Sequence, residues 1–311
     1  MMGRADGGSP DALAPDDAFT LVGNETRIGI LRALWTVYDP DADDNAVPFS
    51  ELVDRVGAGD TGNFNYHLGK LTGHFVRRTD TGYELTAPGF KIVRAVIAGG
   101  VTRNPVVEST PVGATCYRCG STVEITYEDG TVWARCSTCD GYWPQRGGEI
   151  FGFSLPPEGL RGRSPEEIFD ATIGYSIRRF ETMIDGICPE CSGAVDTSLA
   201  VCADHDHAEG ICEACDSRFL GVLTCVCVSC KFAWRCPSYA WVSNHPALVS
   251  FYYRHGVEHV PSTWAAINRG LGWREERVPT DPLSLRLTVE HDGERLRFVI
   301  DHVGAITAVE A

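Results

Sequence analysis

The chain has 311 residues, of which 42 are acidic and 27 basic, and its formal net charge is −15. This length is sufficient for two or three compact domains. The absence of any run of about eighteen apolar residues argues against a membrane span. The N-terminal residues lack an apolar core, so we predict a flexible acidic tail over residues 1–15 rather than a signal peptide, and a cytoplasmic protein.

The charge composition indicates the salt conditions in which the protein works rather than the class of molecule that it binds. An acidic chain is by itself a poor match for nucleic acid. Only three of the basic residues are lysines, however, namely Lys70, Lys91 and Lys231. An acidic surface with almost no lysine is expected of a protein that works in very high salt. On that hypothesis the local charge, and not the total, indicates the partner.

Residues 16–104 are predicted to form a winged helix-turn-helix domain. Asp16 or Asp17 is expected to cap the first helix, and the apolar spacing and turn residues then predict these elements in chain order: a helix over Ala18–Trp35, a helix over Phe49–Val56, a turn at Gly57–Gly59, a helix over Thr61–Leu71, strands over 75–79 and 83–86, and a helix over Ala87–Ala98. A helix-turn-helix followed directly by a tight hairpin is typical of DNA-binding winged helix domains.

The third helix of this domain is the predicted reading element. Phe64, Leu68 and Leu71 form its buried stripe, so the opposite face is polar. Residues 61–94 carry five basic residues against two acidic ones, and phosphate neutralisation is the main source of affinity for DNA. An ordinary solvated face is the alternative. The predicted DNA-contacting residues of the helix and wing are Asn63, Asn65, Tyr66, Lys70, Arg77 and Arg78.

The run Asp60–Leu71, with its Tyr66-His67-Leu68 core, and the wing ending Gly82–Thr86 with Gly89 resemble the ArsR-type winged helix regulators of halophilic archaea. The resemblance covers about residues 16–100. More loosely, the whole chain is similar to longer members that add zinc knuckles and end with a helix containing His245-Pro246-Ala247. It implies a homodimer on a twofold-symmetric operator. Metal-sensing relatives carry a Cys-x-Cys site on the helix before the turn, and Phe49–Val56 has no cysteine, so sensing there is not predicted.

Residues 105–150 are predicted to form a zinc ribbon. Two Cys-x-x-Cys knuckles sixteen residues apart supply four thiolates, Cys116, Cys119, Cys136 and Cys139. A hairpin of Val123–Tyr127 and Thr131–Ala134 would join the knuckles. Four thiolates on two knuckles are typical of a closed structural zinc site, and disulfides or free thiols are the alternative.

Residues 188–240 form a second Cys-rich region, with three knuckles: Cys188 and Cys191, Cys212 and Cys215, and Cys227 and Cys230. Six thiolates exceed the need of one tetrahedral zinc. In one solution the first two knuckles share a zinc and the third is spare. In the other, which we slightly favour, the first and third share one zinc. The second knuckle then binds another with Cys202 and either His205 or His207. Cys225 and Cys236 are predicted to be buried small residues. Two or three structural zinc ions are therefore expected.

The remaining segments complete an α+β fold: an N-terminal winged helix-turn-helix, zinc-ribbon units and a small C-terminal α/β region. Over residues 151–187, the capping box at Ser164 predicts a connecting helix that reaches about Asp185. Residues 241–311 are predicted to form a helix, Trp241–His255, and three strands, at 283–289, 296–300 and 305–309.

Phosphate-binding loops, nucleophile elbows and His-Glu-x-x-His motifs are absent from the sequence, so no enzymatic activity is predicted. The prediction is a transcription regulator that binds double-stranded DNA as a homodimer, with a zinc-stabilised region that responds to a small-molecule or protein effector and no membrane partner. The main alternative is a zinc-ribbon interaction module of the transcription machinery without sequence-specific DNA binding. A metal-dependent enzyme is a second alternative.

Overall fold

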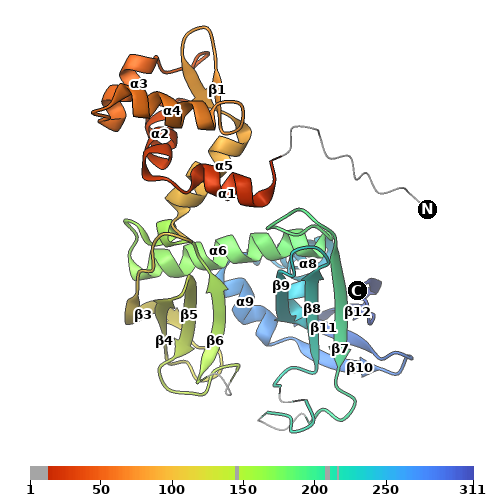
Figure 1. Ribbon diagram of the computed structural model, residues 1–311. Coiled ribbons are helices and arrows are strands. Elements are labelled where there is room, and N and C mark those ends of the chain that lie inside the picture. Colours follow the sequence, from red (N-terminus) through yellow and green to blue (C-terminus); the bar gives the residue numbers. More distant parts are fainter. Residues whose placement is uncertain (1–12, 144–146, 207–210, 216) are drawn as a thin grey trace, which may run out of the picture. The chain divides into compact units, whose positions relative to one another are not determined.

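The computed structural model describes residues 13–143, 147–206, 211–215 and 217–311. The fold is mixed α+β with several antiparallel sheets, and the chain divides into two compact units, Met1–Arg103 (unit 1) and Asn104–Ala311 (unit 2) (Figure 1). Within the described ranges, no helix combines the length and the apolar character that crossing a membrane requires.

Unit 1 packs its helices around one apolar core, to which Ile30, Leu52, Phe64, Leu68 and Val93 contribute fully buried side chains. Strands β1 and β2 form an antiparallel hairpin in which Val76 pairs with Leu85. The described elements of unit 1 are α1 (Pro15–Val22), α2 (Glu25–Thr36), α3 (Phe49–Val56), α4 (Thr61–Leu71), β1 (Val76–Arg78), β2 (Tyr83–Leu85) and α5 (Ala87–Ala98).

The prediction of one continuous helix over Ala18–Trp35 is wrong, because the segment forms two helices, α1 and α2. Gly23 ends α1, and the Asn24 side chain caps α2 by accepting a hydrogen bond of 3.2 Å from the backbone N–H of Arg27. The chain starts α1 at Pro15, inside the predicted tail, with Asp16 and Asp17 in its first turn rather than at the cap. Residues 1–12 of that predicted tail lie outside the described residues.

The described residues of unit 2 form three antiparallel sheets, ordered β3-β4-β5-β6, β7-β8-β9 and β10-β11-β12-β13. Its described elements are β3 (Val107–Thr115), β4 (Thr122–Glu128), β5 (Thr131–Cys136), β6 (Glu149–Ser154), a 3-10 turn (Pro157–Leu160), α6 (Pro165–Ile184), β7 (Val195–Val201), β8 (Gly221–Cys227), β9 (Ala233–Pro237), α7 (Ser238–Val242), α8 (Pro246–Arg254), α9 (Trp264–Leu271), β10 (Arg274–Val278), β11 (Ser284–His291), β12 (Glu294–Ile300) and β13 (Ile306–Glu310).

Helix α6 connects the two cores of unit 2. Its first half buries Ile168, Phe169 and Ile173 against the β3–β6 sheet, and its second half buries Phe180 and Met183 in the core shared by the other two sheets. Figure 1 shows this long helix lying across the sheets. The capping box predicted at its start is present: Ser164 Oγ accepts from the N–H of Glu167, and the Glu167 carboxylate accepts from the N–H of Ser164. The fold of unit 2 therefore depends on a helix that serves two cores at once.

Three predictions for unit 2 need correction. The helix predicted over Trp241–His255 is two helices, α7 and α8, because Pro246 opens α8 and the His245 ring caps it by accepting from the N–H of Ala247 at 3.1 Å. The C-terminal sheet has four strands, since the charged strand β10 pairs along β11. Strand β6 carries the first sheet past the predicted boundary at residue 150, because it pairs with β5.

Candidate metal centres and nucleic-acid interface

Unit 2 brings its Cys-rich segments together as three tetrads that could each hold a metal ion. In each tetrad, the four donor atoms lie within 4.8 Å of one another. The members of the three groups are Cys116, Cys119, Cys136 and Cys139; Cys188, Cys191, Cys227 and Cys230; and Cys202, His205, Cys212 and Cys215.

The first tetrad lies where β5 and the two knuckles of the β3–β6 sheet meet. The Sγ atoms of Cys116 and Cys139 are 3.7 Å apart, and those of Cys119 and Cys136 are 3.4 Å apart. A zinc ion with four thiolates at about 2.3 Å places neighbouring sulfurs about 3.8 Å apart. The observed separations are close to the edge of that tetrahedron, so only small side-chain adjustments would close it around a cation.

A common backbone turn shapes the knuckles. In four of them the N–H of the first cysteine donates to the carbonyl five residues later, as for Cys116 to Ser121 at 2.8 Å. Cys188, Cys212 and Cys227 repeat this bond. In the knuckles of Cys116, Cys188 and Cys227, the residue after the second cysteine has a positive φ, namely Gly120, Ser192 and Lys231. This turn directs backbone N–H groups at sulfur: the N–H of Cys230, for example, donates to Cys227 Sγ at 3.4 Å. Such donors stabilise thiolates.

The second tetrad resolves the alternatives that the sequence left open. Cys188 and Cys230 have their Sγ atoms 3.5 Å apart, as do Cys191 and Cys227. The first and third knuckles of the region are therefore partners. The antiparallel pairing of β7 with β8 causes this, because Val195 lies opposite Cys227 and places the knuckle before β7 beside the knuckle after β8.

The third tetrad combines the middle knuckle with a segment that follows β7. The His205 ring is buried, with Nδ1 3.3 Å from Cys215 Sγ. Cys202 and His205 join Cys212 and Cys215, as in the favoured solution. His207, the other histidine considered, lies outside the described residues.

Each tetrad contains one cysteine that is readily deprotonated. A hydrogen bond from the Ser121 side chain is the main cause that lowers the pKa of Cys119 to about 6. Backbone donors lower the pKa of Cys227 to about 6 and that of Cys212 to about 7. Burial has the opposite effect on Cys139 and Cys215, whose pKa values rise to about 12. At neutral pH a thiolate is thus available in each tetrad to bind a cation first, since the thiolate is the ligand form.

The first and third tetrads are joined by an ion pair. The Asp140 carboxylate, next to Cys139, accepts a bond of 2.7 Å from Arg218, which follows the third tetrad in sequence. Phe219 then stacks on Tyr142 with the ring centroids 6.3 Å apart. The cysteines outside the tetrads, Cys225 and Cys236, are buried in the core of the β7–β9 sheet.

In unit 1, helix α4 separates an apolar face from a polar one. Phe64, Leu68 and Leu71 are buried in the core of unit 1. All six predicted DNA-contacting residues are exposed to solvent: Asn63, Asn65, Tyr66, Lys70, Arg77 and Arg78. Asp60 caps α4 by accepting from the N–H groups of Gly62 and Asn63, at 2.8 and 3.2 Å. The cap fixes where the helix begins and so which residues form its exposed face.

Some of the exposed cations already have partners within unit 1. Arg77 Nε donates to the Glu84 carboxylate across the β1–β2 hairpin at 2.5 Å, and this bond raises the Arg77 pKa. The Lys70 ammonium lies 5.6 Å from the centroid of the Tyr66 ring, one helical turn away. The Arg77 pair would compete with phosphate for the guanidinium, whereas a ring contact leaves the Lys70 N–H groups able to donate.

The chain matches two protein families. Residues 113–306 match a family described as a domain of unknown function (DUF7351). Residues 15–96 match a second, also described as a domain of unknown function (DUF7347). No curated protein matches the chain.

Proposed function

Because the chain belongs to the DUF7351 family, whose description names no activity, we propose its function from the geometry: a winged helix transcription regulator that binds double-stranded DNA in a sequence-specific way through unit 1. Unit 2, in this proposal, is a zinc-stabilised region that carries the regulatory input. The proposal includes no chemical reaction.

The observation that carries the proposal is the exposed polar face of α4. Asn63, Asn65, Tyr66 and Lys70 lie on a helix whose other face anchors it in the core. Asparagine amides can pair with adenine in the major groove, and lysine and tyrosine can donate to phosphates or base edges. A helix of this kind, followed by the β1–β2 hairpin with Arg77 and Arg78, has the chemistry that groove recognition requires.

A matched pair of lysine variants tests the proposal. Lys70→Ala removes a cation from the exposed face of α4, and Lys91→Ala removes one from α5, outside the proposed reading element. We expect Lys70→Ala to weaken binding to all duplexes and to lower the slope of log affinity against log salt by about one, as the loss of one phosphate contact does. Lys91→Ala is expected to have the smaller effect. Equal affinities for the two variants, or absence of any duplex binding, would refute the proposal.

We also propose that the three tetrads hold zinc ions in structural, closed sites. The sets of four cysteines, or of three cysteines and one histidine, are those that structural zinc prefers. Four protein donors fill a tetrahedral zinc and leave no position for substrate. The sulfur separations of 3.4–3.7 Å in the first two tetrads support this assignment.

A homodimer completes the proposal, because a twofold-symmetric operator needs two reading helices. Helix α1 is the candidate contact: all eight of its residues are described and none is buried within the chain. Phe19 on this helix is 75% exposed. A second copy of α1 or of a neighbouring surface would cover it.

A further inference from the structure

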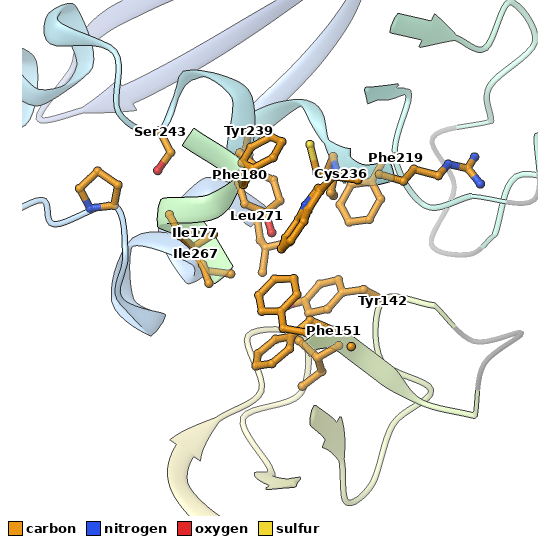
Figure 2. A pocket seen from close by; sticks show the side chains of 18 of the residues that line it. Tyr142, Phe151, Ile177, Phe180, Phe219, Cys236, Tyr239, Ser243, Ile267 and Leu271 are labelled. Atoms are coloured by element: carbon orange, nitrogen blue, oxygen red, sulfur yellow. The ribbon is translucent and has the colours of Figure 1, made fainter. Parts of the chain in front are cut away.

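Two regions of the molecule differ in how much they specify about a ligand. The partly open cavity between the β3–β6 and β7–β9 sheets of unit 2 is lined mainly by aromatic and aliphatic side chains, among them Phe151, Phe180 and Leu271 (Figure 2). Apolar walls of this kind suit many ligands and select none. The exposed face of α4 in unit 1 is more specific, because each polar side chain there suits some bases and not others.

Helix α4 lacks most of the side chains that read G·C pairs. Arginine is the most frequent reader of guanine, and carboxylates accept from the amino group of cytosine. The sequence of α4 contains no arginine, aspartate or glutamate. The exposed residues of α4 are Thr61, Gly62, Asn63, Asn65, Tyr66, Gly69 and Lys70. The two asparagine amides on this face suit adenine, to which an amide can both donate and accept.

Lys70 is the residue of α4 that could still read guanine, and its position favours a phosphate instead. It lies in the last turn of the helix, with its ammonium 5.6 Å from the centroid of the Tyr66 ring. In a recognition helix the N-terminal residues contact base edges, and groups towards the other end contact the DNA backbone. Asn63, Asn65 and Tyr66 are therefore the base-reading residues, and Lys70 is a backbone contact.

Tyr66 stands at the centre of the exposed face. At about 3.6 residues per turn it points away from the buried stripe of α4, and it is 59% exposed. Gly62 and Gly69, about one turn before and after it, have no side chains that could screen its ring. Apolar side-chain surface in the major groove contacts the C5-methyl group of thymine. The ring of Tyr66 is thus suited to thymine, between asparagines that are suited to adenine.

The wing supplies a second preference for A·T pairs. Arg77 is bound to Glu84 across the hairpin. Arg78 lies 5.9 Å from the centroid of the Tyr83 ring and has no carboxylate partner among the described residues. The narrow minor groove of A·T-rich DNA has an enhanced negative potential that attracts arginine. Arg78 is the wing cation that is free to enter such a groove.

We propose that the base pairs contacted by unit 1 are A·T pairs. Asn63 and Asn65 read adenines, Tyr66 contacts a thymine methyl group, and Arg78 enters a narrow A·T minor groove. This base assignment rests on the proposed DNA binding and adds the identity of the pairs to it. Enrichment of a motif with G·C pairs at the major-groove positions would overturn the base assignment and leave the proposed DNA binding intact. Enrichment of no motif would remove both.

Substituted duplexes separate the two grooves. The probe is the duplex that the zinc-loaded, full-length protein enriches most from a random pool, and fluorescence anisotropy measures its affinity. Each A·T pair is replaced by G·C or by inosine·cytosine, which resembles G·C in the major groove and A·T in the minor groove. We expect both replacements to weaken binding roughly tenfold at positions read by α4. At positions read by the wing only G·C should weaken it. Equal affinities for all three duplexes at every position would refute the assignment.

Deoxyuridine tests the contact of Tyr66, because it differs from thymidine only by the missing methyl group. Its substitution at the contacted thymine should weaken binding of the parent roughly three- to fivefold, the effect of one buried methyl group. Tyr66→Ala should bind the two duplexes equally. Lys70→Ala is the matched control on the same helix: it should weaken both duplexes and keep the difference between them. A full methyl effect in Tyr66→Ala would exclude the contact.

Two wing variants test the minor-groove contact through base preference rather than affinity. Arg78→Ala should no longer distinguish A·T from G·C at the positions read by the wing. Arg77→Ala should keep that preference, although its unpaired Glu84 carboxylate would lower the affinity for every duplex. Both arginines are exposed on β1, so both variants should fold. A preference that persists in Arg78→Ala would overturn the assignment of Arg78.

Discussion

At the residue scale, a substitution at Gly69 on α4 has opposite expected effects on helix stability and on the proposed DNA binding. A Cβ placed at Gly69 would meet no described atom within 4 Å, and the residue is exposed beside Tyr66 and Lys70. Gly69→Ala should therefore stabilise unit 1 by about 0.5–1 kcal/mol, because alanine loses less backbone entropy in a helix. If DNA approaches this face closely, the same methyl group should weaken DNA binding. Thermal melting and fluorescence anisotropy measure the two effects on one variant.

Gly89 provides the contrasting case. A Cβ there would lie 2.1 Å from the carbonyl oxygen of Phe75, where the start of α5 packs against the strand region. Gly89→Ala is expected to destabilise unit 1 by about 2 kcal/mol or more, since backbone must move to relieve the overlap. A Gly89→Ala variant as stable as the parent in urea titration would show that the close approach is not as the structure has it.

The third tetrad makes a numerical prediction about metal content. Cys202→Ser removes one of its ligands, so the bound zinc should fall from three ions to two per chain. Cys225→Ala is the control: this cysteine is buried in the core, outside the three tetrads, and the variant should keep three ions. Elemental analysis of the purified proteins counts them. Three ions in Cys202→Ser would remove Cys202 from the ligand set.

At the element scale, three helices that the sequence predicts in full have clear end signals. Helices α3, α4 and α5 have the predicted bounds, because Asp60 and Thr86 cap the last two and glycines follow α3 and α5. Among the missed features, the break between α1 and α2 at Gly23-Asn24 and helix α9, which Thr263 caps, do have such signals, whereas strand β10 has none. Strand β10 is charged at four of its five positions, and it forms an edge strand in which Glu275 turns inward to accept from the N–H of Leu220 at 2.7 Å.

For the metal centres, local spacing and long-range strand pairing supply different information. Cys-x-x-Cys spacing is local, so it indicates which residues bind metal. Which knuckles share an ion depends on strand pairing. The register of β7 against β8 brings Cys188 and Cys191 to Cys227 and Cys230, and spacing alone cannot distinguish that arrangement from the other closed one.

Helix α1 makes a prediction about assembly. Phe19→Glu places a charge on the most exposed large apolar side chain of this helix, and Thr20→Glu places the same charge on its exposed neighbour. If α1 forms the dimer contact, Phe19→Glu should shift the protein towards monomer, and Thr20→Glu should do so less. Light scattering after size-exclusion chromatography measures the masses. Equal dimer fractions in both variants and the parent would exclude Phe19 from the interface.

At the scale of the whole molecule, the two units should differ in their need for metal. The core of unit 1 contains no cysteine among its described residues, whereas the three tetrads lie in unit 2. Because metal binding in such sites contributes directly to folding free energy, removing zinc with a chelator should unfold unit 2 and leave unit 1 folded. Hydrogen exchange should show lost protection in β4 and β8 and retained protection in α4. Simultaneous loss in both units would contradict their independence.

The central claim is that α4 reads DNA sequence, and selection of binding sites from a pool of random duplexes tests it most directly. The parent protein should enrich a twofold-symmetric motif. Asn65→Ala should enrich the same motif with one base position per half-site relaxed, because only that amide contact is lost. Enrichment of no motif by the parent, or of an unaltered motif by Asn65→Ala, would contradict the assignment of α4 as the reading helix.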